Sequence, residues 1–378
     1  MKRPPVLIMS NHIDGLGGAE RVSHAIAAGL SQRGYDVALR GIRPAADERI
    51  DLAGVPYSVG FMSERAENPR DMSPLDEGVR RQMRAEAVAN LERLLPRYRN
   101  GVFICTQLYV MEHVAEIGIE KQLNAGTRII GQYHSSYDAA ILTGDYTRIS
   151  RLYRQIDKFL LLTAEDSHNF RRKNFNNTGF MLNPLSMTPQ LSRGLADDAK
   201  EDLVVAVARQ DANKQMDHAV RAWSMICRQH PGWRLELHGD GPEHDSLRGL
   251  VDLLGIGDSV SLMGLTRDVP AVLDRAKISI LCSRYEGLPM VVAESQAHGV
   301  VPVSYDCSPG VRELINDQET GLLITPQDEQ ALAAGLSALM TEGARRRAMG
   351  AAARESVQRL EASRIMDGWE DQIQRVMR

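Results

Sequence analysis

The sequence predicts an α/β protein with two doubly wound parallel-sheet domains. Short apolar runs of four to six residues alternate with amphipathic helical patterns along the chain. Such runs are typical of parallel strands that are buried on both faces and connected by helices. The alternation occurs in two series, which a polar stretch without periodicity separates. With 378 residues, the chain is long enough for two domains, each with its own core.

The first series predicts an N-terminal domain over residues 1–185. Its expected strands are residues 6–9, 36–39, 102–105, 128–131, 158–163 and 180–185. Residues 44–101 show no clear strand, and their main feature is an arginine-rich helical pattern from Asp76 to Tyr98. We interpret this pattern as a solvated helix face. An acceptor-binding or membrane-surface patch is the alternative for the same region.

The second series predicts a C-terminal domain over residues 201–357. A polar linker, residues 186–200, precedes it. Its expected strands are residues 203–208, 234–238, 260–262, 278–281 and 300–304. The tail from Asp328 onward has a helical pattern, with breaks expected near Gly343 and Gly350. Residues 358–378 form the terminal helix.

Composition and charge exclude several classes of function. Hydrophobic residues make up 43% and charged residues 25% of the chain, as in ordinary globular proteins. The net charge of −4 gives no reason to expect a nucleic-acid partner. No apolar run approaches the roughly 18 residues that span a bilayer, and no signal peptide is evident. We therefore expect a cytoplasmic protein, with peripheral contact at the inner face of the membrane as an open alternative.

The cysteines predict neither a metal site nor a disulfide framework. They are scattered along the chain without metal-type spacing, and most lie in apolar strand or helix patterns. The four are Cys105, Cys227, Cys282 and Cys307. We expect them to be buried free thiols in a reducing compartment.

The glycine-rich loop after the first strand does not fit a dinucleotide-binding fingerprint. The third glycine of GxGxxG would stand at position 20, which is Glu20. The acidic residue expected at the end of the second strand is also missing, and Arg40 and Arg43 lie in that region. A ligand can still approach the backbone closely at Gly17 and Gly18. A tight turn needed only for packing is the alternative.

His134 is a candidate site residue because of its position. It follows the expected strand 128–131, and open α/β sheets bind ligands at the carboxyl ends of their strands. A single histidine in such a place can equally be structural.

The most informative stretch is the strand-to-helix turn that follows the apolar run 278–281. Glu286 lies in this turn, and Glu294 lies about two helical turns further on. Between them, Gly287–Met290 places backbone N–H groups at a helix N-terminus, which is a suitable site for phosphate. A nucleotide-sugar needs such an arrangement, with amides for the diphosphate and carboxylates for hydroxyls.

Two cations accompany this turn in the same predicted sheet. Arg209 and Lys214 follow the strand 203–208, so they can line one crevice with Glu286 at the carboxyl ends of the strands. Two cations and a helix N-terminus can neutralise a diphosphate without a metal. No Asp-x-Asp motif is present in a loop suited to a metal, and we expect no metal ion or other cofactor.

Each of these residues also has a simpler interpretation. Arg209 and Lys214 could be surface charges, and Glu286 could be a carboxylate of the helix-capping kind. Glu294 could be an exposed helix residue. The combination at this spacing favours the binding site.

The spacing E-x7-E of Glu286 and Glu294 resembles that of the retaining glycosyltransferases of family 4, which have the GT-B fold. The resemblance covers essentially the whole chain, and it is more specific in the second domain than between residues 44 and 125. It implies two Rossmann-like domains that face each other across a cleft, with residues 358–378 crossing back to the first domain. The other matching segments are the glycine-rich first loop, R-x4-K at Arg209 and Lys214, His238–Pro242, Met263–Leu265 and Tyr305–Ile315.

The resemblance implies roles for individual residues. Arg209 and Lys214 would bind the donor diphosphate, and Glu294 would bind the ribose of the nucleotide. Glu286 would hold the hydroxyls of the donor sugar near the reacting carbon, and His134 would face that sugar. The catalytic set is therefore Glu286, His134, Arg209 and Lys214. The further donor contacts are Gly264, Leu265, Gly287, Leu288, Pro289, Met290, Gly17 and Gly18.

The implied reaction is transfer of a hexose, glucose or N-acetylglucosamine, from a UDP-sugar to a hydroxyl with retention at the anomeric carbon. The segment 131–136 resembles enzymes that glycosylate wall teichoic acid or related polymers. It therefore indicates a carbohydrate or polyol-phosphate acceptor of the cell envelope. The alternatives are a catalytically silent partner subunit and another GT-B enzyme of nucleotide-sugars, such as an epimerase or an inverting transferase. The intact cations and glutamates disfavour the first, and the E-x7-E pair disfavours the second.

Overall fold

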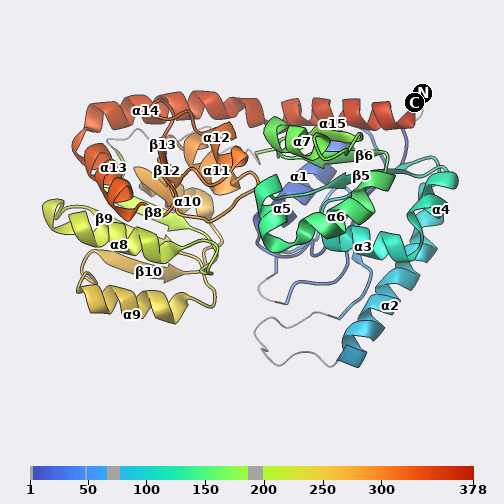
Figure 1. Ribbon diagram of the computed structural model, residues 1–378, viewed down its shortest axis with the longest axis horizontal. Helices are drawn as coiled ribbons and strands as arrows, with labels where there is room; N and C mark the ends of the chain where they lie inside the picture. Colours follow the sequence, from blue (N-terminus) through green and yellow to red (C-terminus); the bar gives the residue numbers. More distant parts are fainter. Residues whose placement is uncertain (1–2, 47–48, 66–76, 186–198) are drawn as a thin grey trace. The chain divides into compact units, whose positions relative to one another are not determined.

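The computed structural model describes residues 3–46, 49–65, 77–185 and 199–378. This part of the chain divides into two compact units (Figure 1). The N-terminal unit contains Met1–Ser186 and Leu360–Arg378, and the C-terminal unit contains Met187–Arg359. The expected linker, residues 186–200, lies outside the described residues up to residue 198.

The N-terminal unit is built on a parallel sheet. Its strands, as far as the structure describes them, are β1 (Val6–Ser10), β2 (Val37–Gly41), β3 (Ser58–Phe61), β4 (Val102–Cys105), β5 (Arg128–Gln132), β6 (Lys158–Leu161) and β7 (Thr178–Phe180). They lie in the order β3-β2-β1-β4-β5-β6-β7, and all neighbours are parallel. The order reverses between β1 and β4, which is where such sheets bind ligands.

Helices connect these strands, as expected for parallel neighbours. The described helices of this unit are α1 (Gly18–Gln32), α2 (Glu77–Leu94), α3 (Leu108–Glu116), α4 (Ile119–Asn124), α5 (Tyr137–Thr143), α6 (Asp145–Leu152), α7 (Ala164–Arg171) and α15 (Ala362–Met377), with the 3-10 turns η1 (Leu95–Tyr98) and η2 (Tyr153–Gln155). The central strands are buried along their whole length, which explains their continuous apolar sequence.

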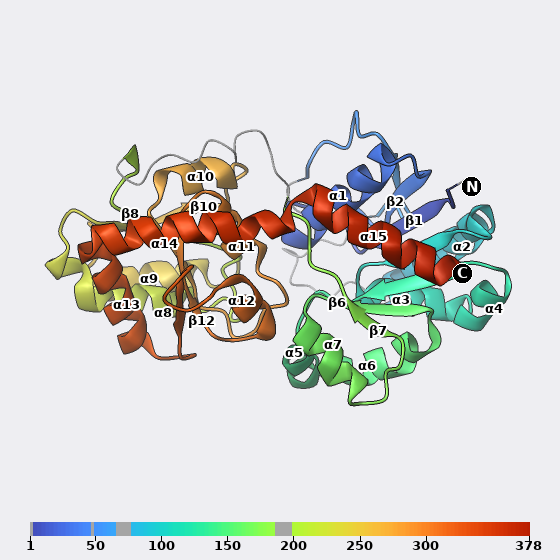
Figure 2. The same cartoon turned by 90° about the horizontal axis from the view of Figure 1, so that it is seen from above.

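The terminal helix α15 packs against α1 within the N-terminal unit (Figure 2). Its strongly amphipathic sequence buries Trp369 and Ile373 completely. Gly29 of α1 permits this approach, because a Cβ there would lie 2.5 Å from Cγ of Met366. At the edge of the contact, Arg33 donates to Glu370 at 2.6 Å. Residues 360–378 are thereby part of the N-terminal core.

The C-terminal unit has a second parallel sheet. Within the described residues its strands are β8 (Leu203–Val207), β9 (Arg234–His238), β10 (Val260–Gly264), β11 (Ile278–Leu281), β12 (Val301–Tyr305) and β13 (Leu322–Ile324). Their order is β10-β9-β8-β11-β12-β13. This is the doubly wound arrangement, and its order reverses between β8 and β11.

Helices cover both faces of this sheet. Those described are α8 (Met216–Ile226), α9 (His244–Leu254), α10 (Val269–Arg275), α11 (Met290–Ala297), α12 (Pro309–Leu314), α13 (Glu329–Thr341) and α14 (Gly343–Ser356), with the 3-10 turns η5 (Cys227–Gln229) and η6 (Val357–Leu360). Along β8, Val204 faces the core shared with α8 and α13, whereas Val205 faces the core beside α10. This alternation is the two-residue period of a strand.

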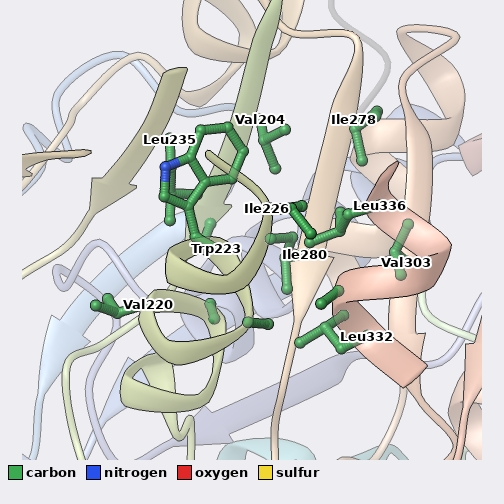
Figure 3. Close-up of a cluster of buried hydrophobic side chains, with 14 of the residues drawn as sticks. Val204, Val220, Trp223, Ile226, Leu235, Ile278, Ile280, Val303, Leu332 and Leu336 are labelled. Atoms are coloured by element: carbon green, nitrogen blue, oxygen red, sulfur yellow. The ribbon is translucent and has the colours of Figure 1, made fainter. Parts of the chain in front are cut away.

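Trp223 lies in the middle of the larger core (Figure 3). The side chain is fully buried, and its indole N–H donates to Ser259 Oγ at 3.0 Å. The other labelled members come from strands on one side and from α8 and α13 on the other: Val204, Val220, Ile226, Leu235, Ile278, Ile280, Val303, Leu332 and Leu336.

The α/β class and the two parallel sheets predicted from the sequence are confirmed. Three expected strands, β4, β9 and β11, have the predicted limits. The edge strands β3 and β13 were not predicted, because β3 is partly exposed and β13 has only three residues. The expected strand 180–185 is wrong, since the strand there is Thr178–Phe180.

The break expected near Gly350 is also wrong. Helix α14 runs without interruption through this residue, although α13 does end just before Gly343. A Cβ on Gly350 would lie 2.5 Å from the carbonyl oxygen of Gly299. The glycine therefore serves the close packing of α14 beside the end of α11, not the end of a helix.

We expect Trp223→Ala to lower the free energy of unfolding of the C-terminal unit by about 3–5 kcal/mol, because it leaves a large cavity in a closely packed core. Urea denaturation followed by circular dichroism measures this change. Leu253→Ala is the control, since Leu253 is 81% exposed on α9, and it should change stability by less than about 0.5 kcal/mol. Equal effects of both substitutions would contradict the described core.

Candidate functional site

The loop between β8 and α8 is fixed by its own side chains. The Asp211 carboxylate accepts hydrogen bonds from the backbone N–H groups of Asn213 and Lys214, at 3.0 and 3.1 Å. Gln215 ends the loop in the left-handed region, with φ of 44°, and α8 begins at the next residue. Arg209, at the start of the loop, lies 3.4 Å from Asp211 through its Nε, and its side chain is 71% exposed. The loop therefore presents two cations at the carboxyl end of β8.

Asn213 connects this loop to the loop between β11 and α11. Its carbonyl oxygen accepts from the N–H of Arg284 at 2.8 Å. Its side-chain amide both accepts from and donates to the backbone of Tyr285, at 3.3 Å each. Sequence reasoning missed Asn213. The available signal was a polar amide between Arg209 and Lys214, in a loop already assigned to the site.

Lys214 and Glu286 are in direct contact. The ammonium Nζ of Lys214 donates to Glu286 Oε1 at 2.5 Å, and Ser283 Oγ donates to the same oxygen at 2.6 Å. The Glu286 side chain is only 11% exposed and that of Lys214 only 24%. Water therefore screens the pair less than it would screen a pair on the surface. The sequence placed these two residues on one crevice, and the structure brings them together.

The charge of Glu286 also affects the neighbouring loop after β12. Burial, together with the negative charge of Glu286, raises the pKa of the Cys307 thiol to about 12. Cys307 is therefore a neutral thiol at physiological pH. It therefore adds no second negative charge beside Glu286 at the carboxyl edge of the sheet.

The segment Gly287–Pro289 is buried and leads into α11. Met290 and Val291 begin that helix, so their N–H groups have no intrahelical carbonyl to bind. Gly310, in the first turn of α12, packs directly on the carbonyl of Gly287, and a Cβ there would overlap that oxygen. Sequence reasoning missed this close approach, which fixes the backbone ahead of α11.

Glu294 lies within α11, four residues after the start of the helix, and is partly buried. The helix thus carries it away from the turn that holds Glu286. The sequence predicted this separation from the spacing of the two residues.

Gly264 and Leu265 lie at the carboxyl end of β10. Gly264 has φ of 72°, in the region that favours glycine, and its carbonyl accepts from the N–H of Gly239 at 2.7 Å. Gly239, with φ of 135°, packs so closely on Ala208 that a Cβ would overlap the Ala208 carbonyl oxygen. The ends of β8, β9 and β10 are thus held together, and Leu265 remains 47% exposed beside them.

Gly17 and Gly18 lie in the N-terminal unit, at the start of α1. Their surroundings differ, because a Cβ on Gly17 would overlap the Glu20 carboxylate, whereas one on Gly18 would meet nothing within 4 Å. Burial raises the pKa of Glu20. Glu20, which stands where a dinucleotide fingerprint has its third glycine, therefore fills the space beside Gly17.

His134 follows β5 at the carboxyl edge of the N-terminal sheet. Its Nε2 lies 3.4 Å from Gln132 Oε1, and the side chain is partly buried. Burial lowers the pKa of His134 to about 4. The imidazole is therefore neutral at physiological pH.

Neither a metal cluster nor a membrane span is found in the part of the chain that the structure describes. No group of three or more His, Cys, Asp or Glu side chains there is arranged to hold a metal ion. None of the described helices is long and apolar enough to cross a membrane. The expectation that no metal is needed stays a prediction.

Solved structures show that the fold is GT-B, the two-domain fold of many glycosyltransferases. The chain superposes on HepE from Anabaena, solved with UDP and glucose, with a TM-score of 0.76 over 98% of this chain and 100% of that one, at 17% identity. Sucrose-phosphate synthase from Thermosynechococcus elongatus gives 0.78 over 98% and 99%, at 19% identity. A TarM variant from S. aureus, solved with fondaparinux, α-GlcNAc-glycerol and UDP, gives 0.66 over 76% and 58%, at 17% identity.

The family follows from the sequence of the C-terminal unit. Residues 188–356 match the family "Glycosyl transferases group 1". Almost the whole C-terminal unit thus matches a group 1 glycosyltransferase domain, as the motifs indicated. Membership of family 4 and the retaining mechanism stay predictions.

Two relatives that match the chain along most of its length are named as glycosyltransferases. Over 169 residues, 44% of this chain, it is 40% identical to an exopolysaccharide phosphotransferase from Streptomyces coelicolor, of which it covers only 18%. It is 27% identical to an uncharacterized glycosyltransferase from Haemophilus influenzae, covering 90% of this chain and 91% of the relative. It is 24% identical to the amylovoran biosynthesis glycosyltransferase AmsD from Erwinia amylovora, covering 97% and 98%.

The lowered pKa of His134 predicts a loss of stability in acid. The unfolded imidazole binds its proton near the ordinary value of 6.5, whereas the folded one binds it only near 4. The contribution of the neutral imidazole to the free energy of unfolding is therefore fully present above about pH 7. It is lost as the pH falls towards 4. From pH 7 to pH 5, the free energy of unfolding of the wild type should fall by about 1–2 kcal/mol more than that of His134→Gln. Urea denaturation at the two pH values measures both changes. Parallel losses in both proteins would contradict the buried, neutral histidine.

Proposed function

We propose that this chain is a retaining glycosyltransferase that moves a hexose from a UDP-sugar to a hydroxyl of a cell-envelope glycan or polymer. The observation that carries the proposal is the contact of Lys214 with Glu286 in a group 1 glycosyltransferase domain, where the strand order reverses. This is the place in a doubly wound sheet where nucleotides bind.

The cations and the start of α11 suit the diphosphate of the donor. Arg209 is largely exposed and Lys214 lies beside it in one ordered loop, so both can reach one anion. The first N–H groups of α11 add donors at the positive end of the helix dipole. In the reaction, negative charge develops on the leaving UDP. Donors aimed at that charge would stabilise the transition state more than the ground state.

Glu286 suits the hydroxyls of the donor sugar. Its Oε1 is occupied by Lys214 and Ser283, and this holds the carboxylate in one orientation. A carboxylate with a fixed orientation in a partly dry site forms strong hydrogen bonds to hydroxyl donors. Glu294, further along α11, would bind the ribose, and the exposed side chain of Leu265 would contact the base. These roles follow the family resemblance.

Retention without a covalent glycosyl-enzyme intermediate requires that the acceptor attacks from the face that the leaving group occupies. The phosphate oxygen of the departing UDP would then take the proton of the acceptor hydroxyl. In this scheme the protein needs no side chain as a strong base. A neutral His134 suits a hydrogen bond to a sugar hydroxyl, because it adds no charge. We also propose that two cations and the helix amides replace a metal ion, so that transfer continues in EDTA.

The comparisons support the choice of donor and acceptor class. HepE was solved with UDP and glucose, and TarM with UDP and α-GlcNAc-glycerol. These names favour UDP-glucose or UDP-N-acetylglucosamine. AmsD is a glycosyltransferase of amylovoran biosynthesis, and the S. coelicolor relative is an exopolysaccharide phosphotransferase. They favour a polysaccharide or polymer acceptor.

The site predicts that Glu286→Gln separates binding from chemistry. We expect this substitution to lower kcat by about 100-fold or more, since it removes a charged acceptor at the reacting sugar. The affinity for UDP should change by less than about threefold, because Arg209, Lys214 and the first N–H groups of α11, which we assign to the diphosphate, all remain. UDP release from a panel of UDP-sugars with glycan acceptors measures the first quantity, and calorimetric titration with UDP measures the second.

Variants of the cations complete this test. Arg209→Met and Lys214→Met should each weaken UDP binding by about tenfold, because each removes a charged donor to phosphate. Arg234→Gln is the matched control, since Arg234 is exposed at the amino end of β9 and pairs with Glu201 at 2.8 Å. Absence of UDP release with every donor would refute the proposed activity. Unchanged UDP affinity in both cation variants would refute their assignment.

A further inference from the structure

A separate hollow of about 310 Å³ lies in the N-terminal unit at the carboxyl ends of β2 and β3. Arg43 follows β2 at this edge, and Tyr109 and His113 come from α3, which follows β4. The helix α2 contributes Arg80, Arg81 and Arg84. We call these six residues the arginine pocket. Its position is the sheet edge at which open α/β sheets bind ligands.

The wall of the arginine pocket is strongly basic. Four arginines line it, against one carboxylate among the lining residues, Glu77. Glu116 is paired with Arg84 and offsets one of these four charges, whereas Glu86 accepts from Ser63 at 3.0 Å. The whole chain has a net charge of −4, so this local excess of positive charge is not a general property of the protein.

Two of the four arginines are held in place. The guanidinium of Arg43 lies 5.5 Å from the centre of the Tyr109 ring, and that of Arg84 lies 6.0 Å from it. Contact with one aromatic ring restricts both side chains before any ligand binds.

His113 supplies a hydrogen-bond acceptor in the same wall. Its Nδ1 lies 2.9 Å from the carbonyl oxygen of Tyr109, which can only accept, so Nδ1 carries the proton. The ring is fully buried, and burial lowers its pKa, so it stays neutral. Its Nε2 has no hydrogen-bond partner among the described residues. Such a nitrogen suits a hydroxyl that lies next to the anion.

We propose that the arginine pocket binds a phosphate ester of the acceptor, with the hydroxyls beside it, as in a polyol phosphate or a glycosyl phosphate. Guanidinium groups bind phosphate oxygens in pairs, and several of them around one hollow favour a phosphate over a neutral sugar. The volume fits one small ligand segment. The proposal rests on the proposed transferase function, because an acceptor site presupposes transfer.

The test uses the full chain and a synthetic glycerol-phosphate hexamer, with maltohexaose as the neutral probe, in calorimetric titrations. The pocket variant is Arg80→Gln/Arg81→Gln, and both of these side chains are exposed, so folding should be retained. The matched control is Arg93→Gln/Arg97→Gln, which removes two exposed charges from α2 and η1, outside the pocket lining. UDP titrated into the same samples reports the donor site separately. Loss of UDP binding is therefore distinguishable from loss of hexamer binding at the arginine pocket.

We expect the wild type to bind the hexamer and not maltohexaose. The pocket variant should lose about tenfold or more of that affinity, and the control less than about twofold. No binding of the hexamer to the wild type, or equal losses in both variants, would overturn the proposal. A second result would also overturn it: the pocket variant keeps its affinity for the hexamer but no longer binds phosphatidylcholine vesicles that contain phosphatidylglycerol. That result would assign the arginines to an anionic membrane surface.

Discussion

The candidate donor site depends on the contact of Lys214 with Glu286, at 2.5 Å. The two residues are 72 positions apart in the sequence. They meet because β8 and β11 are neighbours where the strand order reverses, and because Asn213 bonds one loop to the backbone of the other. The pair is partly shielded from water, so removal of either partner would leave a poorly solvated charge. The topology of the sheet, and not the local sequence, creates this pair.

Each unit carries its own set of chemical groups at the carboxyl edge of its sheet. The C-terminal unit holds the loops that we propose for a nucleotide diphosphate, and its sequence is the part that matches the group 1 glycosyltransferase family. The N-terminal unit holds a neutral histidine and the arginine pocket. Its glycine loop has the Glu20 carboxylate beside Gly17, in the space next to the position of the missing third fingerprint glycine. In our proposal, donor chemistry belongs to the C-terminal unit and acceptor recognition to the N-terminal unit.

Much of the fold follows from local patterns in the sequence. Continuous apolar runs mark buried parallel strands, so β4, β9 and β11 were predicted with their limits. Edge strands such as β3 lack that pattern because they are only partly buried. Gly350 looked like a helix end, yet its role is to let two helices approach. The residues assigned to the donor loops came from motif and position, and their roles stay predictions. Asn213 and Gly310 were not, because their contacts join segments far apart in the sequence.

The most direct test of this account is hydrogen exchange of the backbone amides with and without UDP, read by mass spectrometry. Exchange should slow in residues 208–216 and 284–294, the two loops that Lys214 and Glu286 join. A phosphate bound by Arg209, Lys214 and the first N–H groups of α11 would restrict local opening of both loops. Exchange in α13, residues 329–341, should not change and serves as the internal control. Unchanged exchange in both loops at saturating UDP, or protection only elsewhere, would contradict a nucleotide site at the junction of β8 and β11.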